Sequence, residues 1–188
     1  MPVLRQLLAG LRFLVVMTVL LGIAYPAVIT LAAQVFPAQA NGSLVRDASG
    51  AVVGSALIGQ QFDGPQWFQS RPSASDYSGQ TSGGSNLSPA SQKQLAARAD
   101  REAQLRAANP DAVGSIPDDA LTASASGLDP DISVAYAQWQ VPRVAKARGM
   151  DPSVLQALIA ANTVPAPLGY IGQDGVNVTT LNLALAQR

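Results

Sequence analysis

The chain has 188 residues, with 12 basic and 12 acidic side chains and therefore no net charge, and it contains neither cysteine nor histidine. Those two absences exclude thiol nucleophiles, imidazole general bases, Ser-His-Asp triads and zinc sites built from Cys and His, and they leave only carboxylate-based catalysis open. Because the chain carries no clustered positive charge, nucleic acids and anionic lipid surfaces are poor candidates for partners.

The amino-terminal segment is long and apolar. No charged residue lies between Arg12 and Arg46, and the stretch from Phe13 to Ala33 is almost wholly apolar. At a helical rise of ~1.5 Å per residue this stretch extends ~31 Å, close to the ~30 Å hydrocarbon thickness of a bilayer. We therefore predict a transmembrane helix at about residues 13–33 within an amino-terminal region 1–36, with a bend at Pro26.

Basic residues flank this helix on one side only. Arg5 and Arg12 precede it, and the next basic residue is Arg46. Because basic flanks are retained in the cytoplasm during insertion, the amino terminus is predicted to be cytoplasmic and the rest of the chain extracytoplasmic. The alternative is a cleaved signal followed by a secreted binding module, since Ala38-Gln39-Ala40 fits the small-x-small cleavage pattern. A signal's apolar region runs only ~7–15 residues, which favours an uncleaved anchor.

A single α+β domain is predicted for residues 50–188, after a linker at 37–49. About 150 residues suffice for one core. The apolar run 51–58 between two glycines indicates a strand or hairpin, Trp67 and Phe68 indicate core, and the Ser- and Gly-rich stretch 73–88 indicates a surface loop. Arg71, held extended before Pro72, is interpreted as a surface or carboxylate-paired residue.

Three helices are predicted, each opened by a cap residue followed by proline. The first is expected to pack through Leu95 and Leu105, and the second to bend or divide at Pro142. Residues 115–126 are expected to form a turn and an extended segment, and residues 176–185 to begin as a strand and end in helix-favouring residues. The expected first and last residues of the helices are Ser88 to Ala108, Asp129 to Gly149, and Asp151 to Asn162.

One enzymatic alternative is compatible with the composition. A membrane-tethered hydrolase could use paired carboxylates, and the sequence offers Asp118 with Asp119, and Asp129 with Asp131. Adjacent aspartates beside proline are more typical of turns and helix caps, so no catalytic residue and no metal ligand is assigned.

Six stretches occur in an order that resembles the C subunit (KdpC) of the Kdp high-affinity potassium-transporting P-type ATPase. Two positions depart from the family pattern, since Asp131 stands where a histidine is usual and Gly175 where an arginine is usual. The matching stretches are Gln39-Ala40-Asn41-Gly42-Ser43-Leu44, Arg71-Pro72-Ser73-Ala74, Ser82-Gly83-Gly84-Ser85-Asn86-Leu87, residues 122–130, residues 143–149, and residues 176–185.

The resemblance implies a single-span, non-catalytic subunit in the bacterial cytoplasmic (inner) membrane. The implied partners are a channel-like potassium-binding subunit, a P-type ATP-hydrolysing subunit and a small hydrophobic subunit. It also implies a catalytic chaperone that raises the ATP affinity of the hydrolysing subunit. No cofactor is assigned to this chain itself, and ATP is implied only through the hydrolysing subunit. The loop similar to a nucleotide-contacting element contains Gln80, Ser82, Gly83, Gly84, Ser85 and Asn86.

The predicted topology conflicts with direct contact to ATP, because a domain outside the cytoplasm cannot reach cytoplasmic nucleotide. We therefore interpret the loop as a contact to a partner subunit. The polar residues expected to fix the fold or the docking of the domain are Arg71, Asp129, Arg143, Arg148 and Asn177.

Overall fold

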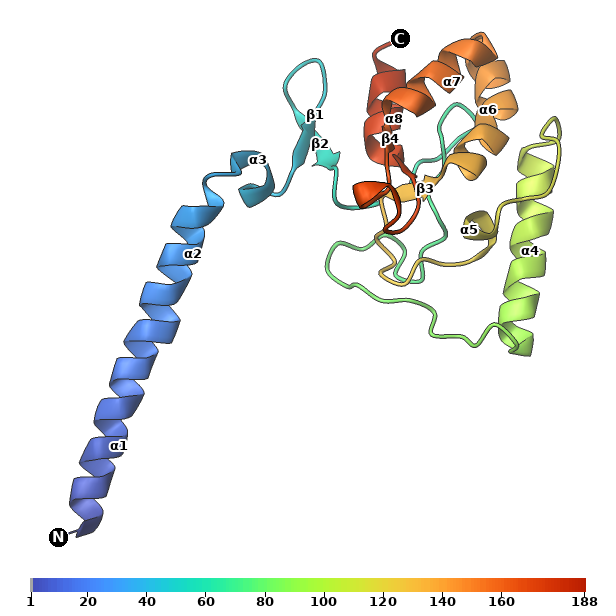
Figure 1. Ribbon diagram of the computed structural model, residues 1–188. Coiled ribbons are helices and arrows are strands. Elements are labelled where there is room, and N and C mark those ends of the chain that lie inside the picture. The colour runs from blue at the N-terminus through green and yellow to red at the C-terminus, as the bar shows by residue number, and fades with distance from the viewer. Residues whose placement is uncertain (1) are drawn as a thin grey trace. The chain divides into compact units, whose positions relative to one another are not determined.

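The computed structural model describes residues 2–188 and divides into two compact units (Figure 1). The amino-terminal unit ends at Ser43, and the second unit, which we call the head, runs from Leu44 to Arg188. The boundary lies within the segment 37–49 that was predicted as a linker, and that segment contains the short helix α3 (Pro37–Ala40) and the strand β1 (Leu44–Arg46).

The amino-terminal unit contains one helix long and apolar enough to cross a membrane, from Pro2 to Ala33. It consists of α1 (Pro2–Val19), a π-helical turn at Leu20–Ala24 and α2 (Tyr25–Ala33). The π-turn ends two residues before Pro26, which has no N–H to donate, and the N–H of its C-cap residue Tyr25 donates to the Leu20 carbonyl. A signal sequence passes the same test of length and composition, so the helix alone does not decide between anchor and signal.

The head contains two small antiparallel sheets. In the first, β1 pairs with β2 (Val52–Ser55), with Leu44 opposite Ser55. The strand predicted within 51–58 is therefore confirmed, and its partner lies upstream. In the second sheet the order is β3-β5-β4. Its strands are β3 (Asp131–Ser133), β5 (Gly175–Asn177) and β4 (Thr163–Val164).

Five helices and one 3-10 turn complete the head, which confirms the predicted α+β class. The helices α6, α7 and α8 pack around the three-stranded sheet (Figure 1). The five helices of the head are α4 (Gln92–Ala108), α5 (Asp118–Leu121), α6 (Val134–Arg148), α7 (Pro152–Ala161) and α8 (Val178–Ala186), and the 3-10 turn is η2 (Pro167–Gly169).

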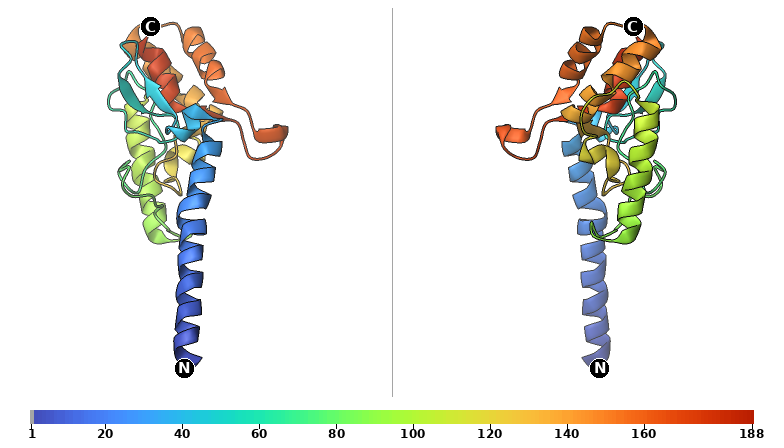
Figure 2. Two further views of the ribbon diagram at one scale, coloured as in Figure 1. Left: turned by 90° about the vertical axis from the view of Figure 1, so that its left-hand side faces the viewer. Right: turned by 90° about the vertical axis from the view of Figure 1, so that its right-hand side faces the viewer.

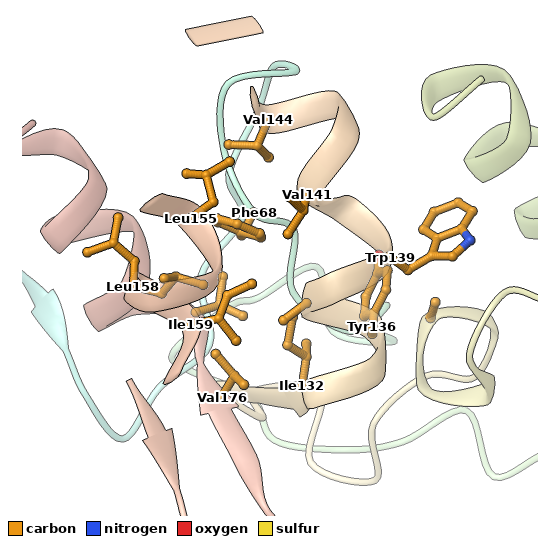
Figure 3. Close-up of a cluster of buried hydrophobic side chains, with 14 of the residues drawn as sticks. Phe68, Ile132, Tyr136, Trp139, Val141, Val144, Leu155, Leu158, Ile159 and Val176 are labelled. Carbon is orange, nitrogen blue, oxygen red and sulfur yellow. The ribbon is translucent and has the colours of Figure 1, made fainter. Parts of the chain in front are cut away.

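The core of the head lies between α6, α7, α8 and the three-stranded sheet (Figure 3). Burying one Leu, Ile or Phe side chain stabilises a fold by about 1.5–3 kcal/mol, so this cluster is the main source of stability. Phe68 belongs to it although it lies in an irregular segment, and its neighbour Trp67 is partly buried. The hydrophobic residues with no measurable exposure are Phe68, Ala137, Val144, Leu155, Val176, Val178, Leu181 and Leu185.

The first predicted helix begins three residues later than expected. Its N-cap is Ser91 and not Ser88, because the Ser91 hydroxyl accepts a hydrogen bond from the Gln94 N–H in a capping-box spacing. Leu95 is 48 % exposed and does not anchor the helix, whereas Leu105 is partly buried against the core. Gln94 is the buried residue of α4.

The second predicted helix differs at its start. Residues 131–133 form strand β3 because they pair with β5, and the helix begins at Val134 with Ser133 as N-cap instead of Asp129. The helix continues through Pro142 without dividing, since Val141 and Val144 on either side are held in the core. The segment 115–126 contains the short helix α5, whose Ala120 and Leu121 are buried, where only a turn and extended chain were expected.

Other predicted boundaries are confirmed. Gly149 closes α6 in the left-handed conformation, with φ of 63°. Asp151 caps α7, which ends before Asn162. The carboxyl-terminal segment begins as β5 and continues as α8.

Candidate functional site

Arg143 on α6 is buried without a carboxylate partner. It is 6 % exposed, and burial lowers the pKa of its guanidinium. The charge is held by four neutral oxygens. Nε donates to Asn109 Oδ1 at 2.7 Å, Nη1 to the carbonyls of Pro65 and Trp67 at 2.7 and 2.9 Å, and Nη2 to Gln140 Oε1 at 2.6 Å. Arg143 therefore joins α6, the end of α4 and the irregular segment before Phe68.

Arg148 makes a similar connection at the end of the same helix. Its Nε donates to the Gln66 carbonyl at 3.0 Å and its Nη1 to the Leu185 carbonyl at 3.0 Å. The guanidinium lies 4.5 Å from the centre of the Trp67 ring, which adds a cation–π contact. Arg148 therefore links α6, α8 and the segment containing Trp67.

Arg71 and Asp129 form the carboxylate pair that the sequence favoured for Arg71. The Arg71 Nη1 lies 3.0 Å from Asp129 Oδ2, and both side chains are partly exposed. The other oxygen of Asp129 accepts from the Asp131 N–H at 3.1 Å, which turns the chain into β3. The pair thus holds the segment around Arg71 against the chain just before β3, at a residue 58 positions later.

Asn177 ends β5 and caps α8. Its Oδ1 accepts from the Thr180 N–H at 3.1 Å, while its Nδ2 donates to the Ala56 carbonyl at 2.8 Å. Thus Asn177, like Arg71, Asp129, Arg143 and Arg148, contacts other parts of the head itself. Their assignment to docking stays a prediction.

Sequence reasoning missed two buried amides, Asn182 and Gln140, which hold the chain around Phe68. Asn182 accepts from the Phe68 N–H at 2.9 Å and donates to the Phe68 carbonyl at 2.8 Å. Gln140 binds the N–H and carbonyl of Gln69 in the same way, at 2.8 and 3.1 Å. A polar amide in the apolar run 178–185 is the signal that could have pointed to Asn182.

The Ser- and Gly-rich loop lies against residues 125–127. The Gly83 N–H donates to the Ser126 carbonyl at 2.8 Å, and the Ser82 hydroxyl donates to the same oxygen at 3.1 Å. A Cβ on Gly84 would lie 3.0 Å from the Ala125 carbonyl oxygen, so a larger residue would crowd this contact and glycine is favoured. Gln80, Ser85 and Asn86 complete the loop, and Asn86 has a positive φ of 52°.

This loop lacks two features of a phosphate-binding loop. A phosphate cradle requires free backbone N–H groups and a nearby cation. The Gly83 N–H is already bonded, and no Lys or Arg lies between Arg71 and Lys93. No step of ATP chemistry is therefore derived through residues 80–86.

Three of the four aspartates of the hydrolase alternative have structural partners, whereas Asp131 Oδ1 is buried without a hydrogen-bond partner in the part of the chain that the structure describes. Asp118 accepts from Arg98 at 2.7 Å, and both oxygens of Asp119 bind Ser133, at 2.7 Å to its N–H and 3.0 Å to its hydroxyl. Asp129 is paired with Arg71. Across residues 2–188, no three His, Cys, Asp or Glu side chains gather as a metal site.

A cleft of about 500 Å³ opens between α4 and the segment 61–77. Tyr136 at its base is 2 % exposed, and burial raises the pKa of its phenol. The Tyr77 hydroxyl, beside the cleft, donates to the Arg71 carbonyl at 2.6 Å. Both charge signs line the cleft, which suits polar groups of a ligand or partner. Its charged residues are Asp63, Asp76 and Arg101.

Asp131 has a raised pKa, first because of burial and second because of repulsion from Asp129. A hydrogen bond from Asn177 opposes the shift. A Cβ on Gly175 would lie 3.3 Å from the Asp131 Cβ. The two departures from the family pattern are therefore spatial neighbours.

The raised pKa of Asp131 predicts a defined pH dependence. The native state holds this proton more tightly than the unfolded chain, so the contribution to stability is fully present below about pH 4 and is lost as pH rises through the native pKa. We expect Asp131→Asn to raise the Tm of the full chain in detergent at pH 7, by about 2 °C, and to have no effect below pH 4.

Asp47 supplies a control of opposite sign. Hydrogen bonding from Ser49 is the main cause that lowers the pKa of Asp47, so Asp47→Asn should lower the Tm at pH 7. Thermal unfolding followed by near-ultraviolet circular dichroism from pH 3.5 to 7.5 measures both variants. If the Tm of Asp131→Asn and that of the natural chain changed in parallel with pH, the raised pKa assigned to Asp131 would be contradicted.

The architecture is consistent with that of a single-span membrane protein: one apolar helix of 32 residues followed by a small α+β head. The family model "K+-transporting ATPase, c chain" (KdpC) matches residues 7–187. The chain belongs to the KdpC family, which confirms the resemblance found in the sequence, and is thus an accessory subunit of a potassium-transporting P-type ATPase complex.

Three relatives illustrate this membership, each a potassium-transporting ATPase KdpC subunit. The chain is 53 % identical to the protein of Caulobacter vibrioides, over 91 % of this chain and 87 % of that one. It is 50 % identical to the Geobacter sulfurreducens protein, over 96 % and 97 %. It is 47 % identical to the Rhodospirillum rubrum protein, over 98 % and 97 %.

Proposed function

We propose that the amino-terminal helix is a permanent anchor in the bacterial inner membrane and that the head lies outside the cytoplasm, on the channel-like potassium-binding subunit. The observation that carries this proposal is the one-sided charge distribution. Arg5 and Arg12 precede the apolar stretch, and no charged residue follows until Arg46. Since positive flanks resist translocation, this end of the helix stays in the cytoplasm.

In this arrangement the head stabilises assembly of the complex and covers the entry path of the ion. A head without a catalytic centre of its own is supported by the aspartates at 118, 119 and 129, which hold its own backbone and side chains. ATP and the head lie on opposite sides of the membrane. The increase in ATP affinity implied by the family is therefore exerted through the partner subunits and not by contact with nucleotide.

The absence of cysteine from the chain allows a direct test of topology. Ser115 is exposed in the head and Gln6 is exposed on α1, so Ser115→Cys and Gln6→Cys each introduce one thiol. With a membrane-impermeant maleimide, we expect intact spheroplasts to label only the Ser115→Cys variant. The Gln6→Cys variant should react only after lysis.

Two results would contradict the proposal. Labelling of Gln6→Cys but not Ser115→Cys in intact spheroplasts would place the head in the cytoplasm. An intact mass that begins at Asn41 would show cleavage after Ala40 and hence a secreted head. Separately, binding of ATP by the purified full chain that is lost in Asn86→Ala would contradict action through partner subunits.

A further inference from the structure

An apolar projection lies between β4 and β5. Residues 164–171, which we call the knuckle, contain the 3-10 turn η2 and extend away from the other elements of the head (Figure 2). The side chains of Val164, Leu168, Tyr170 and Ile171 are 57, 77, 77 and 51 % exposed. An exposed apolar group of four neighbouring large side chains is costly in water and marks an interaction site.

The surroundings of the knuckle define the chemistry of its partner. No charged residue lies between Asp151 and Asp174, so the apolar side chains of the knuckle carry no charge among them. The carboxylate at its edge, Asp174, is already hydrogen-bonded to the Ala166 N–H, so burying the apolar side chains requires no charged side chain of the knuckle itself to lose water. The complementary surface is apolar and uncharged.

The knuckle also has a fixed shape. Pro165 and Pro167 restrict the backbone, and the Asp174 carboxylate accepts a hydrogen bond from the Ala166 N–H at 2.8 Å. The Ile171 N–H donates to the Pro167 carbonyl at 3.1 Å. Leu168 is held at a positive φ of 56°, a strained conformation for a residue with a side chain.

A fixed shape distinguishes a protein recess from a lipid surface. Pre-organisation lowers the entropy lost on docking to a protein, whereas insertion into lipid needs no particular shape. Segments that bind membrane interfaces combine apolar residues with Lys or Arg, and the knuckle contains no Lys and no Arg. A protein partner is thus favoured over the bilayer.

We propose that the knuckle is a docking element that inserts Leu168 and Tyr170 into an uncharged apolar recess on the extracytoplasmic surface of a partner membrane subunit. The inference rests on the proposed function for the side of the membrane on which the partner is met. Leu168 and Tyr170 are the anchors because they are the most exposed members of the knuckle. Tyrosine is also among the residues that dominate interface affinity.

The variant Leu168→Ser with Tyr170→Ser tests the anchors in the assembled transporter. Both side chains are exposed, so the Tm of the full chain should stay unchanged. We expect the chain to bind the tagged transporter at least about 30-fold more weakly, the effect of losing one interface hot spot. Val113→Ser, at a site 88 % exposed between α4 and α5, is the matched control and should bind normally. Unchanged binding of the double variant would overturn the inference.

Photo-crosslinking identifies what the knuckle touches. With p-benzoylphenylalanine in place of Tyr170 in the whole complex, we expect a covalent adduct with a partner subunit at apolar residues. A lipid adduct, or no adduct, would overturn the inference. With Ser115→Cys still labelled from outside, either result leaves the proposed topology intact, whereas loss of that labelling would overturn the topology whatever the adduct.

Discussion

Replacing Arg143 by methionine is expected to lower the free energy of unfolding of the head by about 3–5 kcal/mol. Methionine fills a similar volume but removes the guanidinium donor. Gln140 Oε1 keeps the Gln69 N–H as a donor, whereas Asn109 Oδ1 and the carbonyls of Pro65 and Trp67 lose the donor described above, and each unsatisfied group costs about 1–3 kcal/mol before relaxation. Arg143→Lys should recover little, because an ammonium cannot reproduce the fork that serves Asn109, Pro65, Trp67 and Gln140 together.

Urea unfolding of the full chain in detergent, followed by tryptophan fluorescence, measures this loss. Lys146→Met is the control in the same helix, because Lys146 makes only an exposed ion pair with Asp111 and its loss should cost at most about 1 kcal/mol. Equal costs for the two variants would show that the Arg143 network contributes nothing particular to stability.

Replacing Asn182 by leucine is expected to cost about 2–4 kcal/mol. Leucine keeps the branching and the number of heavy atoms of asparagine but is bulkier, so the cost combines the loss of both hydrogen bonds to the Phe68 backbone with local overpacking. That N–H and carbonyl are buried between α8 and the core and have no access to water as a substitute. Phe68 itself, fully buried, should then lose its fixed position.

Gln187→Leu, at the exposed end of α8, provides the comparison and should change stability by less than about 0.5 kcal/mol. Near-ultraviolet circular dichroism reports the packing of aromatic residues and should change in Asn182→Leu alone. A native near-ultraviolet spectrum and unchanged urea midpoint for Asn182→Leu would contradict the role assigned to this amide.

Local signals in the sequence were sufficient for several elements of the fold. The apolar stretch after Arg12 predicts one membrane-length helix, and Gly149 with Asp151 predicts the junction of α6 and α7. Each of these signals depends on residues close together in the chain. Capping chemistry and hydrophobic length are local properties, so they are readable without tertiary information.

Other elements depend on distant partners. Asp129 has the sequence features of an N-cap, but Arg71, 58 residues earlier, takes its carboxylate, and the following residues pair with β5 instead of forming a helix. Ser133 then supplies the cap. Propensity was overridden by pairing over a long sequence distance, which no local pattern specifies.

The candidate site shows the same division. The sequence identified Arg143 and Arg148 as notable cations in the last turns of a helix, where the helix dipole favours positive charge. The contacts with carbonyl groups about 80 residues earlier could not be read from that position. The knuckle was likewise overlooked, because exposure of apolar residues is a tertiary property.

The π-turn at Leu20–Ala24 has a consequence for how the anchor meets neighbouring helices. Its one extra residue offsets the two halves of the helix by roughly 100° about the axis. A row of side chains on one face of α1 therefore continues on a different face of α2. If the helix spans the membrane as proposed, it can face one neighbour in the inner leaflet and a different one in the outer leaflet, so that a single span joins two helices that need not touch each other.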